Sequence, residues 1–577
     1  MAETLLSPGV LARENDQTVT SNIPAAIGAA IMGPTVKGQP YIPKLITSFT
    51  EYLTYFGGAF ISGSSRYTFL TSTAAYNYFQ NGGTSLWVTR IASGAFSPAS
   101  SSTIASSYNA TSASFVLSTL SYGFNQNSSG SEGVSGSLPN GTADNVRWQI
   151  TNANTASGTF TLLIRRGNDT APVPTVLETW PNLSLDPTQD NYIEKVIGNQ
   201  TFSTSSDNLY INTTGNYPNR SNYVTVTSVP LKTPNYFNNV GTPSSASNGT
   251  PYGQYLPLNA SGAFIGGVGE ISGSTAASNY YNNISNTNIQ GFTAANYSTA
   301  ITLMSNADEY AYNVIAAPGL AYGNQQGKDQ LVSLINNTQN RGDAIAVIDT
   351  ELYGGTVTSA TTTANTVDTS YAATYWPWIQ TVDPITGEFT WVPASTMIPS
   401  VYVQNDTIAA PWFAPAGLNR GGILNAVRAE KKLTQADRNT LYQNKVNPIA
   451  TFPGTGVVVY GQKTLQTKSS ALDRVNVRRL LIALKTRISE IANNLVFEQN
   501  TIATRQNFVA AVNPYLQSVQ QQQGLYAFKV IMDDSNNSAE TIDRNQLIGQ
   551  IYLQPTKTAE FIYLDFNVTP TGATFPG

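Results

Sequence analysis

An apolar stripe in the C-terminal part of the chain constrains the fold more than any other feature. Valine, leucine and isoleucine recur at helical spacing over residues 477–495 and form one side of an amphipathic helix. Just upstream, residues 457–460 are a β-branched and aromatic run between two glycines, which is typical of a buried strand. Ser470, with Asp473 three residues later, is a candidate N-cap for the helix. Because the stripe needs a core to bury it, the sequence predicts a packed C-terminal domain.

Basic side chains gather along the same stretch. Between Lys463 and Arg487 only Asp473 is acidic, although the net charge of the whole chain is −4. The seven basic residues are Lys463, Lys468, Arg474, Arg478, Arg479, Lys485 and Arg487. This local charge predicts either a functional face or the ordinary solvated face of an amphipathic helix.

Length and composition narrow the class of protein. A chain of 577 residues exceeds what one hydrophobic core supports, so roughly three or four domains are expected. The chain contains no histidine and no cysteine, which excludes Ser-His-Asp and Cys-His catalysis, zinc–thiolate sites and disulfides. The N-terminus lacks a secretory signal pattern and no run of about 18 apolar residues occurs, so we expect synthesis in the cytosol without a membrane span.

Composition changes sharply near Phe96, and Ser, Thr, Asn and Gly dominate the chain until about residue 299. Alternating segments at 160–164, 208–214 and 222–229 are separated by turn signals. This pattern predicts an insertion of one or two folded β domains rather than disorder.

After the insertion the pattern returns to alternating helices and strands. Segments 314–319 and 344–349 read as buried strands with a helix between them, which predicts a parallel sheet. The glycine-bounded segment 323–328 is one residue too short for a phosphate-binding loop, and Lys328 is followed by Asp329 rather than Ser or Thr. We therefore expect no nucleotide and no other cofactor.

Four short sequence motifs follow one another in the second half of the chain. They are YWPW at 375–378, VPAS at 392–395, WFAPAG at 412–417 and DRVNVRRLLIALKTRI at 473–488. In these motifs and their order the chain resembles contractile bacteriophage (myovirus-type) tail sheath proteins, and the resemblance covers residues 5–95 and 300–570. One departure is PSVYVQND at 399–406, which lacks the small-residue pair of the family.

The resemblance implies a structural subunit and not an enzyme. Such a protein would polymerise with itself as hexameric rings stacked helically around the inner tail tube protein, and would contract to drive the tube through the bacterial envelope. Its other partners would be baseplate and tail terminator proteins, with no direct nucleic acid contact. It would be assembled in the cytoplasm of the bacterial host and would reside in the virion tail. The alternative is a glycan-binding or glycan-cleaving tail or receptor-binding component that uses the β-rich insertion.

The predicted fold class is α/β and α+β multidomain, with a sheath-like core of mixed sheets and helices. The expected parts are an extended N-terminal arm at 1–25, the first part of the core at 26–97, an outward-facing β-rich insertion at 98–299, an α/β domain at 300–455 and a C-terminal domain at 456–577. The resemblance implies that the α/β domain has a subtilisin-like shape without catalysis. It also implies a tube-facing helix in the C-terminal domain.

Three sets of residues are the candidate sites. The tube-facing interface would be the seven basic residues named above. The predicted inter-subunit strand consists of Phe561, Ile562, Tyr563, Leu564, Asp565, Phe566 and Val568, because residues 559–568 are β-prone and have no partner strand after them in the sequence. The predicted N-terminal arm contains Val10, Leu11, Val19 and Ile23, and would pair at the same junction.

Overall fold

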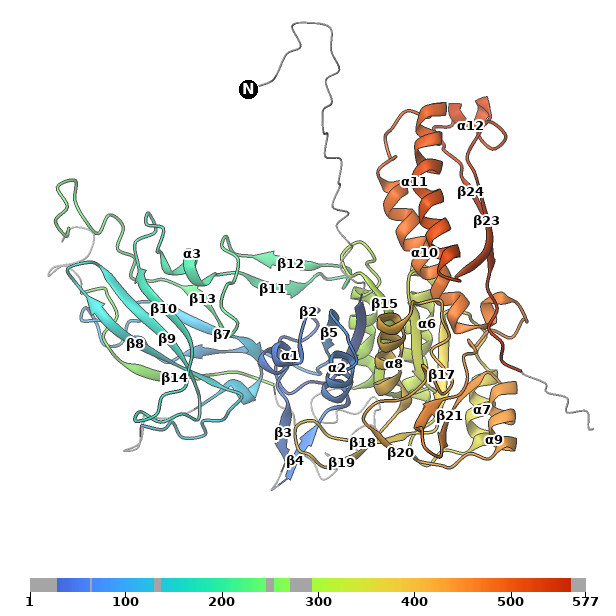
Figure 1. Cartoon of the computed structure of the whole chain (residues 1–577). Coiled ribbons are helices and arrows are strands. Elements are labelled where there is room, and N and C mark those ends of the chain that lie inside the picture. The colour runs from blue at the N-terminus through green and yellow to red at the C-terminus, as the bar shows by residue number, and fades with distance from the viewer. Residues whose placement is uncertain (1–27, 63–64, 129–135, 245–253, 270–292, 562–577) are drawn as a thin grey trace, which may run out of the picture.

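The computed structural model describes residues 28–62, 65–128, 136–244, 254–269 and 293–561 (Figure 1). The predicted arm residues Val10, Leu11, Val19 and Ile23 and the strand residues from Ile562 onward lie outside these ranges. Three parts make up the described chain: a central α/β sheet, a β-rich insertion and a C-terminal helical hairpin on a two-stranded sheet. The expected fold class, α/β and α+β with mixed sheets and helices, is confirmed.

An eight-stranded sheet forms the centre of the molecule. In spatial order its strands are β2 (Lys44–Ile46), β5 (Leu86–Arg90), β1 (Gly28–Gly33), β15 (Tyr312–Ala321), β16 (Ile345–Asp349), β17 (Ala372–Trp376), β21 (Val446–Phe452) and β22 (Gly456–Val459). The strands from β5 to β21 run parallel, whereas β2 and β22 are antiparallel to their neighbours. Since β1 pairs with both β5 and β15, the segments before and after the insertion share one sheet. The parallel sheet expected after the insertion is confirmed.

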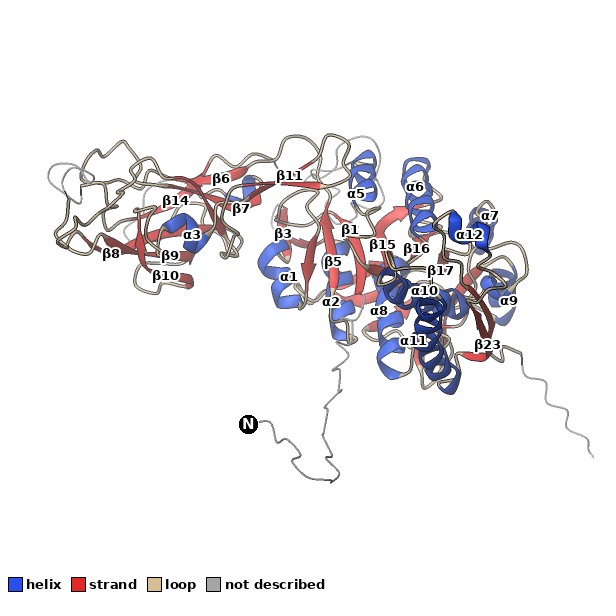
Figure 2. Cartoon of the chain, turned by 90° about the horizontal axis from the view of Figure 1, so that it is seen from above, coloured by secondary structure: helices blue, strands red, loops and turns tan. Residues whose placement is uncertain are grey.

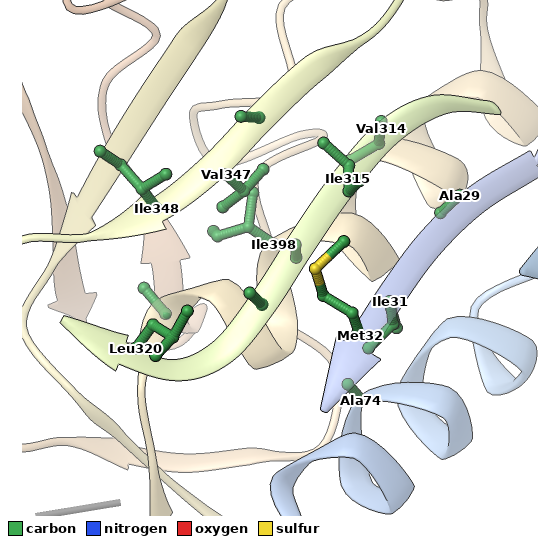
Figure 3. Packing of buried hydrophobic residues seen from close by; sticks show 14 of the residues in the cluster. Ala29, Ile31, Met32, Ala74, Val314, Ile315, Leu320, Val347, Ile348 and Ile398 are labelled. Carbon is green, nitrogen blue, oxygen red and sulfur yellow. The ribbon is translucent and has the colours of Figure 1, made fainter. Parts of the chain in front are cut away.

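Helices cover both faces of the central sheet (Figure 2). They are α1 (Phe49–Phe56), α2 (Leu70–Gln80), α5 (Tyr297–Leu303), α6 (Gln325–Arg341), α7 (Val357–Asn365), α8 (Ala394–Ile408) and α9 (Gln435–Gln443). Parallel strands covered on both faces are mostly apolar, and every residue of β16 is buried, including Asp349 at its end. Figure 3 shows Ile31 and Met32 of β1, Val347 and Ile348 of β16 and Ile398 of α8 in this core.

Two smaller sheets lie at the lower edge of the central part (Figure 1). One is the hairpin of β3 (Ala59–Ser62) and β4 (Ser65–Thr68), and the other is the three-stranded sheet of β18 (Ile379–Val382), β19 (Phe389–Val392) and β20 (Ala426–Ala429).

The insertion has its own sheet and its own core. Its seven strands, in spatial order, are β10 (Val176–Ser184), β9 (Thr159–Arg166), β8 (Val146–Asn154), β14 (Ser261–Ile265), β6 (Pro98–Ser101), β7 (Val116–Tyr122) and β13 (Val224–Ser228). A short helix α3 (Ile193–Ile197) and the pair β11 (Thr201–Thr204) and β12 (Ile211–Thr214) complete it. Phe115, Trp148 and Phe160 are fully buried in its core.

The expected end of the insertion at residue 299 is wrong, because it falls inside α5. Tyr297 and Ala300 of this helix are buried in the core of the central part. The composition of the sequence does not mark this boundary, because the residues before Ala300 are as rich in Asn, Ser and Thr as the insertion itself.

Arg90, at the end of β5, fastens the insertion to the central part. Its side chain is buried, and Nη1 donates hydrogen bonds to the carbonyl oxygens of Gly38 (2.5 Å) and Tyr122 (2.9 Å). Tyr122 lies in the insertion, and its backbone N–H donates to the same Gly38 oxygen at 3.1 Å. Gln39 adds a bond from Nε2 to the carbonyl oxygen of Phe202 at 2.7 Å. The insertion is therefore docked on the loop after β1 and not only tethered to it.

Deleting residues 98–292 and joining the ends through a Gly/Ser linker should leave the central part folded, because none of its eight strands lies in the deleted segment. We expect urea denaturation to show a loss of about 1–3 kcal/mol, since Arg90 loses the Tyr122 carbonyl and keeps a buried charge. Adding Arg90→Met to the deletion variant should recover most of this loss. A deletion variant that does not fold at all would show instead that the insertion is part of the central folding unit.

The C-terminal part contains α10 (Val475–Asn493), α11 (Ile502–Gln521), β23 (Leu525–Ile531), α12 (Ala539–Asp543) and β24 (Gln550–Pro555). The prediction that Ser470 caps the long helix is wrong: Ser470 caps a single 3-10 turn, accepting from Leu472 N at 3.2 Å. Arg474 is extended and forms a bridge with Lys463, so the helix begins only at Val475. The apolar stripe is buried as predicted, because Leu480 and Leu484 pack against α11 and β23.

Candidate assembly surfaces

The two central arginines of the predicted basic face are buried. Arg478 and Arg479 are 4% and 3% exposed. Arg478 Nη2 donates to Ser370 Oγ at 2.5 Å, and its guanidinium lies 4.0 Å from the centre of the Tyr371 ring. The prediction that these two arginines lie on a tube-facing surface is therefore wrong, since both side chains point into the joint between α10 and the central part.

Arg479 forms the centre of this joint. Its Nη2 is 2.5 Å from Asp406 Oδ2, near the end of α8, and its guanidinium lies 4.6 Å from the centre of the Tyr402 ring. Tyr402 and Tyr375 share a hydrogen bond of 2.6 Å between their hydroxyl oxygens. Burial is the main cause that raises the pKa of Tyr402 to about 12, so this phenol stays neutral. The cluster links α10 to both α8 and β17.

Arg474, also predicted to face a tube, instead holds the C-terminal segment. Its Nε and Nη2 donate to the two carboxylate oxygens of Glu560 at 2.7 and 2.9 Å, which is bidentate geometry. Tyr442 Oη donates to Glu560 at 2.7 Å and Gln462 Nε2 at 3.0 Å. Burial would raise the pKa of Glu560, but the hydrogen bonds from Arg474, Tyr442 and Gln462 hold it below its usual range. We call this group the Glu560 anchor.

The other four predicted basic residues differ in exposure. Lys463 is half-buried, with Nζ 4.7 Å from the centre of the Tyr442 ring. Lys468 and Lys485 are exposed, and Arg487 is partly exposed and paired with Glu490 at 2.8 Å. The structure therefore splits the predicted set of seven into the buried joint of Arg478 and Arg479, the anchor residue Arg474 with Lys463 beside it, and a smaller exposed group of Lys468, Lys485 and Arg487.

Beside the Glu560 anchor lies a two-stranded sheet that the sequence analysis missed. β23 and β24 pair antiparallel from Ile531 opposite Gln550 to Leu525 opposite Pro555. Within the described ranges neither strand pairs with a third, so both outer edges lack a strand partner. Two carbonyl oxygens of β23, those of Tyr526 and Ile531, accept side-chain hydrogen bonds from Gln520 and Asn536. One face packs on α11 through Leu525, whereas Tyr526 and Tyr552 are exposed. The β-prone run of Ile551, Tyr552 and Leu553 is the signal that could have revealed β24.

Of the predicted inter-subunit strand, only Phe561 is described. Its side chain is 69% exposed and follows directly after the Glu560 anchor. The anchor therefore fixes the position of the last described residues on this part of the molecule.

The described residues also bear on metal binding and on membrane insertion. No group of three or more His, Cys, Asp or Glu side chains is placed to hold a metal ion in the ranges that the structure covers. Among those same ranges, no helix has the length and apolar character needed to cross a bilayer.

Comparison with known proteins places these features in a family. The central-domain model of phage tail sheath proteins matches residues 290–465, and the C-terminal-domain model matches residues 467–569. The tail sheath protein of Enterobacteria phage T4 is 39% identical over 185 residues, which is 32% of this chain and 28% of that protein. The tail sheath protein of Vibrio phage KVP40 is 39% identical over 209 residues, covering 36% and 31% of the two chains. The chain thus spans less than a third of the length of these relatives.

Structural comparison agrees at the level of the fold. A crystal structure of a sheath tail protein from Listeria innocua has a TM-score of 0.51 and 12% sequence identity, and covers 92% of this chain and 95% of that one. The matched domains place the chain in the class of structural tail proteins of bacteriophages. Residues 290–465 and 467–569 of this chain are the central and C-terminal domains of the contractile phage tail sheath family.

Proposed function

We propose that this chain polymerises as stacked hexameric rings around an inner tail tube, and that the polymer contracts to drive the tube through a bacterial envelope. The match of residues 290–569 to two tail sheath domains carries the proposal. Negative-stain electron microscopy of the purified protein tests it, and ribbed tubules are the expected result. A protein that stays monomeric at every concentration and salt condition would contradict it.

Strand addition between copies is the proposed link within the polymer. The open edges of β23 and β24 can accept extended segments, and the residues after Glu560 and the N-terminal arm are the proposed donors. Residues 561–568 in extended conformation span roughly 25 Å, enough to pair along a strand of a neighbouring copy.

The proposed motion is a rearrangement of rigid bodies. Work would come from the free-energy difference between an extended, metastable arrangement and a contracted one, with no nucleotide consumed. The joint of Arg478 and Arg479 supports this, because it fastens α10 to the central sheet through buried contacts. The proposed further partners are the inner tube, baseplate and tail terminator proteins. The proposed place is the virion tail, after assembly in the host cytoplasm.

The exposed group of Lys468, Lys485 and Arg487 is the proposed tube-facing surface. Changing Lys468 and Lys485 to glutamate should weaken co-sedimentation with tail tubes about fivefold at low salt. The expected effect is modest because a single exposed ion pair between the two proteins contributes little to binding. The difference should shrink as salt rises, since exposed charges are screened beyond ~10 Å at ordinary ionic strength. Lys232→Glu, an exposed lysine of the insertion, is the matched control. Equal tube binding by the unchanged protein, the double variant and Lys232→Glu would mean that the exposed group is an ordinary solvated face of the helix.

A further inference from the structure

The loop between α10 and α11 holds an aromatic side chain out into solvent in an unfavourable backbone conformation. Phe497 is 100% exposed and has φ +71°, in the left-handed region that non-glycine residues rarely adopt. Val496 and Ile502 beside it are 60% and 59% exposed. Neither the exposure nor the conformation stabilises the chain's own fold. Such an outlier motivates a search for a partner that uses it.

The surroundings of Phe497 are acidic. Segments 496–502 and 533–544 contain five acidic residues and one basic residue, Arg544, which pairs with Glu540. Arg505 of α11 pairs with Asp534 at 2.6 Å, so Glu498, Asp533 and Asp543 are the acids without an ion pair within the described residues. Asn500 Nδ2 donates to the carbonyl oxygen of Gln546 at 2.9 Å, which ties the first loop to the region around α12. We call these two segments the tip. In Figure 1, α12 lies beside the end of the α10–α11 hairpin, and this end is the one furthest from the central part.

At the opposite end of α11 lies an aromatic pocket with basic residues. Its volume is about 580 Å³, and Trp412, Phe413 and Tyr526 line it together with Arg420 and Lys557. Arg420 stacks 5.1 Å from the centre of the Phe413 ring. No acidic residue lines the pocket, and neither cation forms an ion pair within the part of the chain that the structure describes.

We propose that the tip of one copy docks into the aromatic pocket of another copy. An exposed apolar loop with acidic neighbours complements an aromatic hollow with basic neighbours, in both polarity and charge. Aromatic residues and arginine are also the types that dominate protein interfaces. A cavity of this volume can hold a phenylalanine ring and its neighbours.

The contact has to join two copies and cannot close within one. The tip precedes the first residue of α11, whereas Gln520 of the pocket lies in its last turn. A helix of 20 residues is about 30 Å long, so the tip and the pocket of one chain are about that far apart. Two different patches that meet head to tail generate rings or helical filaments. The inference rests on the proposed self-assembly and adds a second contact to strand addition.

Cross-linking tests the contact, because the chain contains no native cysteine. Val496→Cys places a thiol beside Phe497 and keeps the ring, and Gln523→Cys places one in the pocket wall. The double variant, assembled and treated with a short bis-maleimide, should give a ladder of covalent multimers. A 1:1 mixture of the two single variants should give cross-linked dimers between them. The control is the double variant Val240→Cys with Gln523→Cys, because Val240 is 83% exposed and lies on the insertion. It should give no ladder.

Assembly should respond to both surfaces. Phe497→Ser and Lys557→Glu are each expected to raise the critical concentration for tubules about tenfold, as for a central interface residue. Glu498→Lys combined with Lys557→Glu should restore much of the loss, and Val240→Ser should change nothing. Two outcomes would overturn this inference and leave the sheath proposal standing. One is the formation of tubules without cross-links between positions 496 and 523, and the other is a cross-link from position 523 to Phe566→Cys instead. Failure of the unchanged protein to polymerise would overturn both.

Discussion

Asp406→Ala is expected to lower the free energy of unfolding by about 3–5 kcal/mol, because it leaves the buried Arg479 guanidinium without its counter-charge. The Arg479 side chain is 3% exposed, and its Nη1 already lacks a hydrogen-bond partner. An arginine cannot escape this penalty by losing its proton at ordinary pH. Urea denaturation followed by tryptophan fluorescence measures the loss.

Two matched variants separate burial from charge pairing. Glu490→Ala removes the partner of Arg487 on the same helix, but both side chains are about 40% exposed, so the expected loss is about 0.5 kcal/mol or less. Asp406→Leu with Arg479→Met removes both buried charges and should recover most of the stability that Asp406→Ala loses. A loss below about 1 kcal/mol in Asp406→Ala would mean that water reaches Arg479 and that the joint is not dry.

Short apolar runs made part of the central sheet predictable, because residues 314–319 and 344–348 are apolar and form much of β15 and β16. The same reasoning failed at Arg478 and Arg479. Their charge suggested solvent, but the first turns of α10 are buried all round, between the central part and α11. The residues that neutralise or cover them, Asp406 and Ser370, are 73 and 108 positions away in the sequence. No local pattern could therefore reveal the pairing.

The Glu560 anchor was hidden for a similar reason. Glu560 lies at the start of a β-prone terminal run, where a single acid carries no signal. Its partners come from α9, from the loop after β22 and from the residue before α10, which only the fold brings together. The open edges of β23 and β24 likewise follow from the sheet topology and not from either strand's sequence.

Removing residues 562–577 is expected to abolish tubules while leaving the melting temperature almost unchanged. The cut falls after Phe561, so the Glu560 anchor stays intact, unlike in a truncation at residue 558. A paired strand of eight residues contributes four or five main-chain hydrogen bonds of about 1 kcal/mol each, and a lattice repeats this link at every subunit. Tyr563→Pro removes one ladder donor and should approach the same result. Polymer formation by the truncated chain would exclude strand addition by these residues.

Glu560→Gln tests whether the anchor aims that strand. The pKa of Glu560 is lowered in the folded chain, so its contribution is fully present above the ordinary glutamate range and is lost as pH falls through the lowered value. The unchanged protein should therefore assemble well at neutral pH and lose assembly in acid. Glu560→Gln keeps the shape but not the bidentate ion pair, and should need a higher protein concentration at neutral pH with a weaker response to acid. Sedimentation of tubules across a pH series measures the protein concentration required for assembly and the response to acid. Identical curves for the two proteins would show that the terminal strand reaches its neighbour without the anchor.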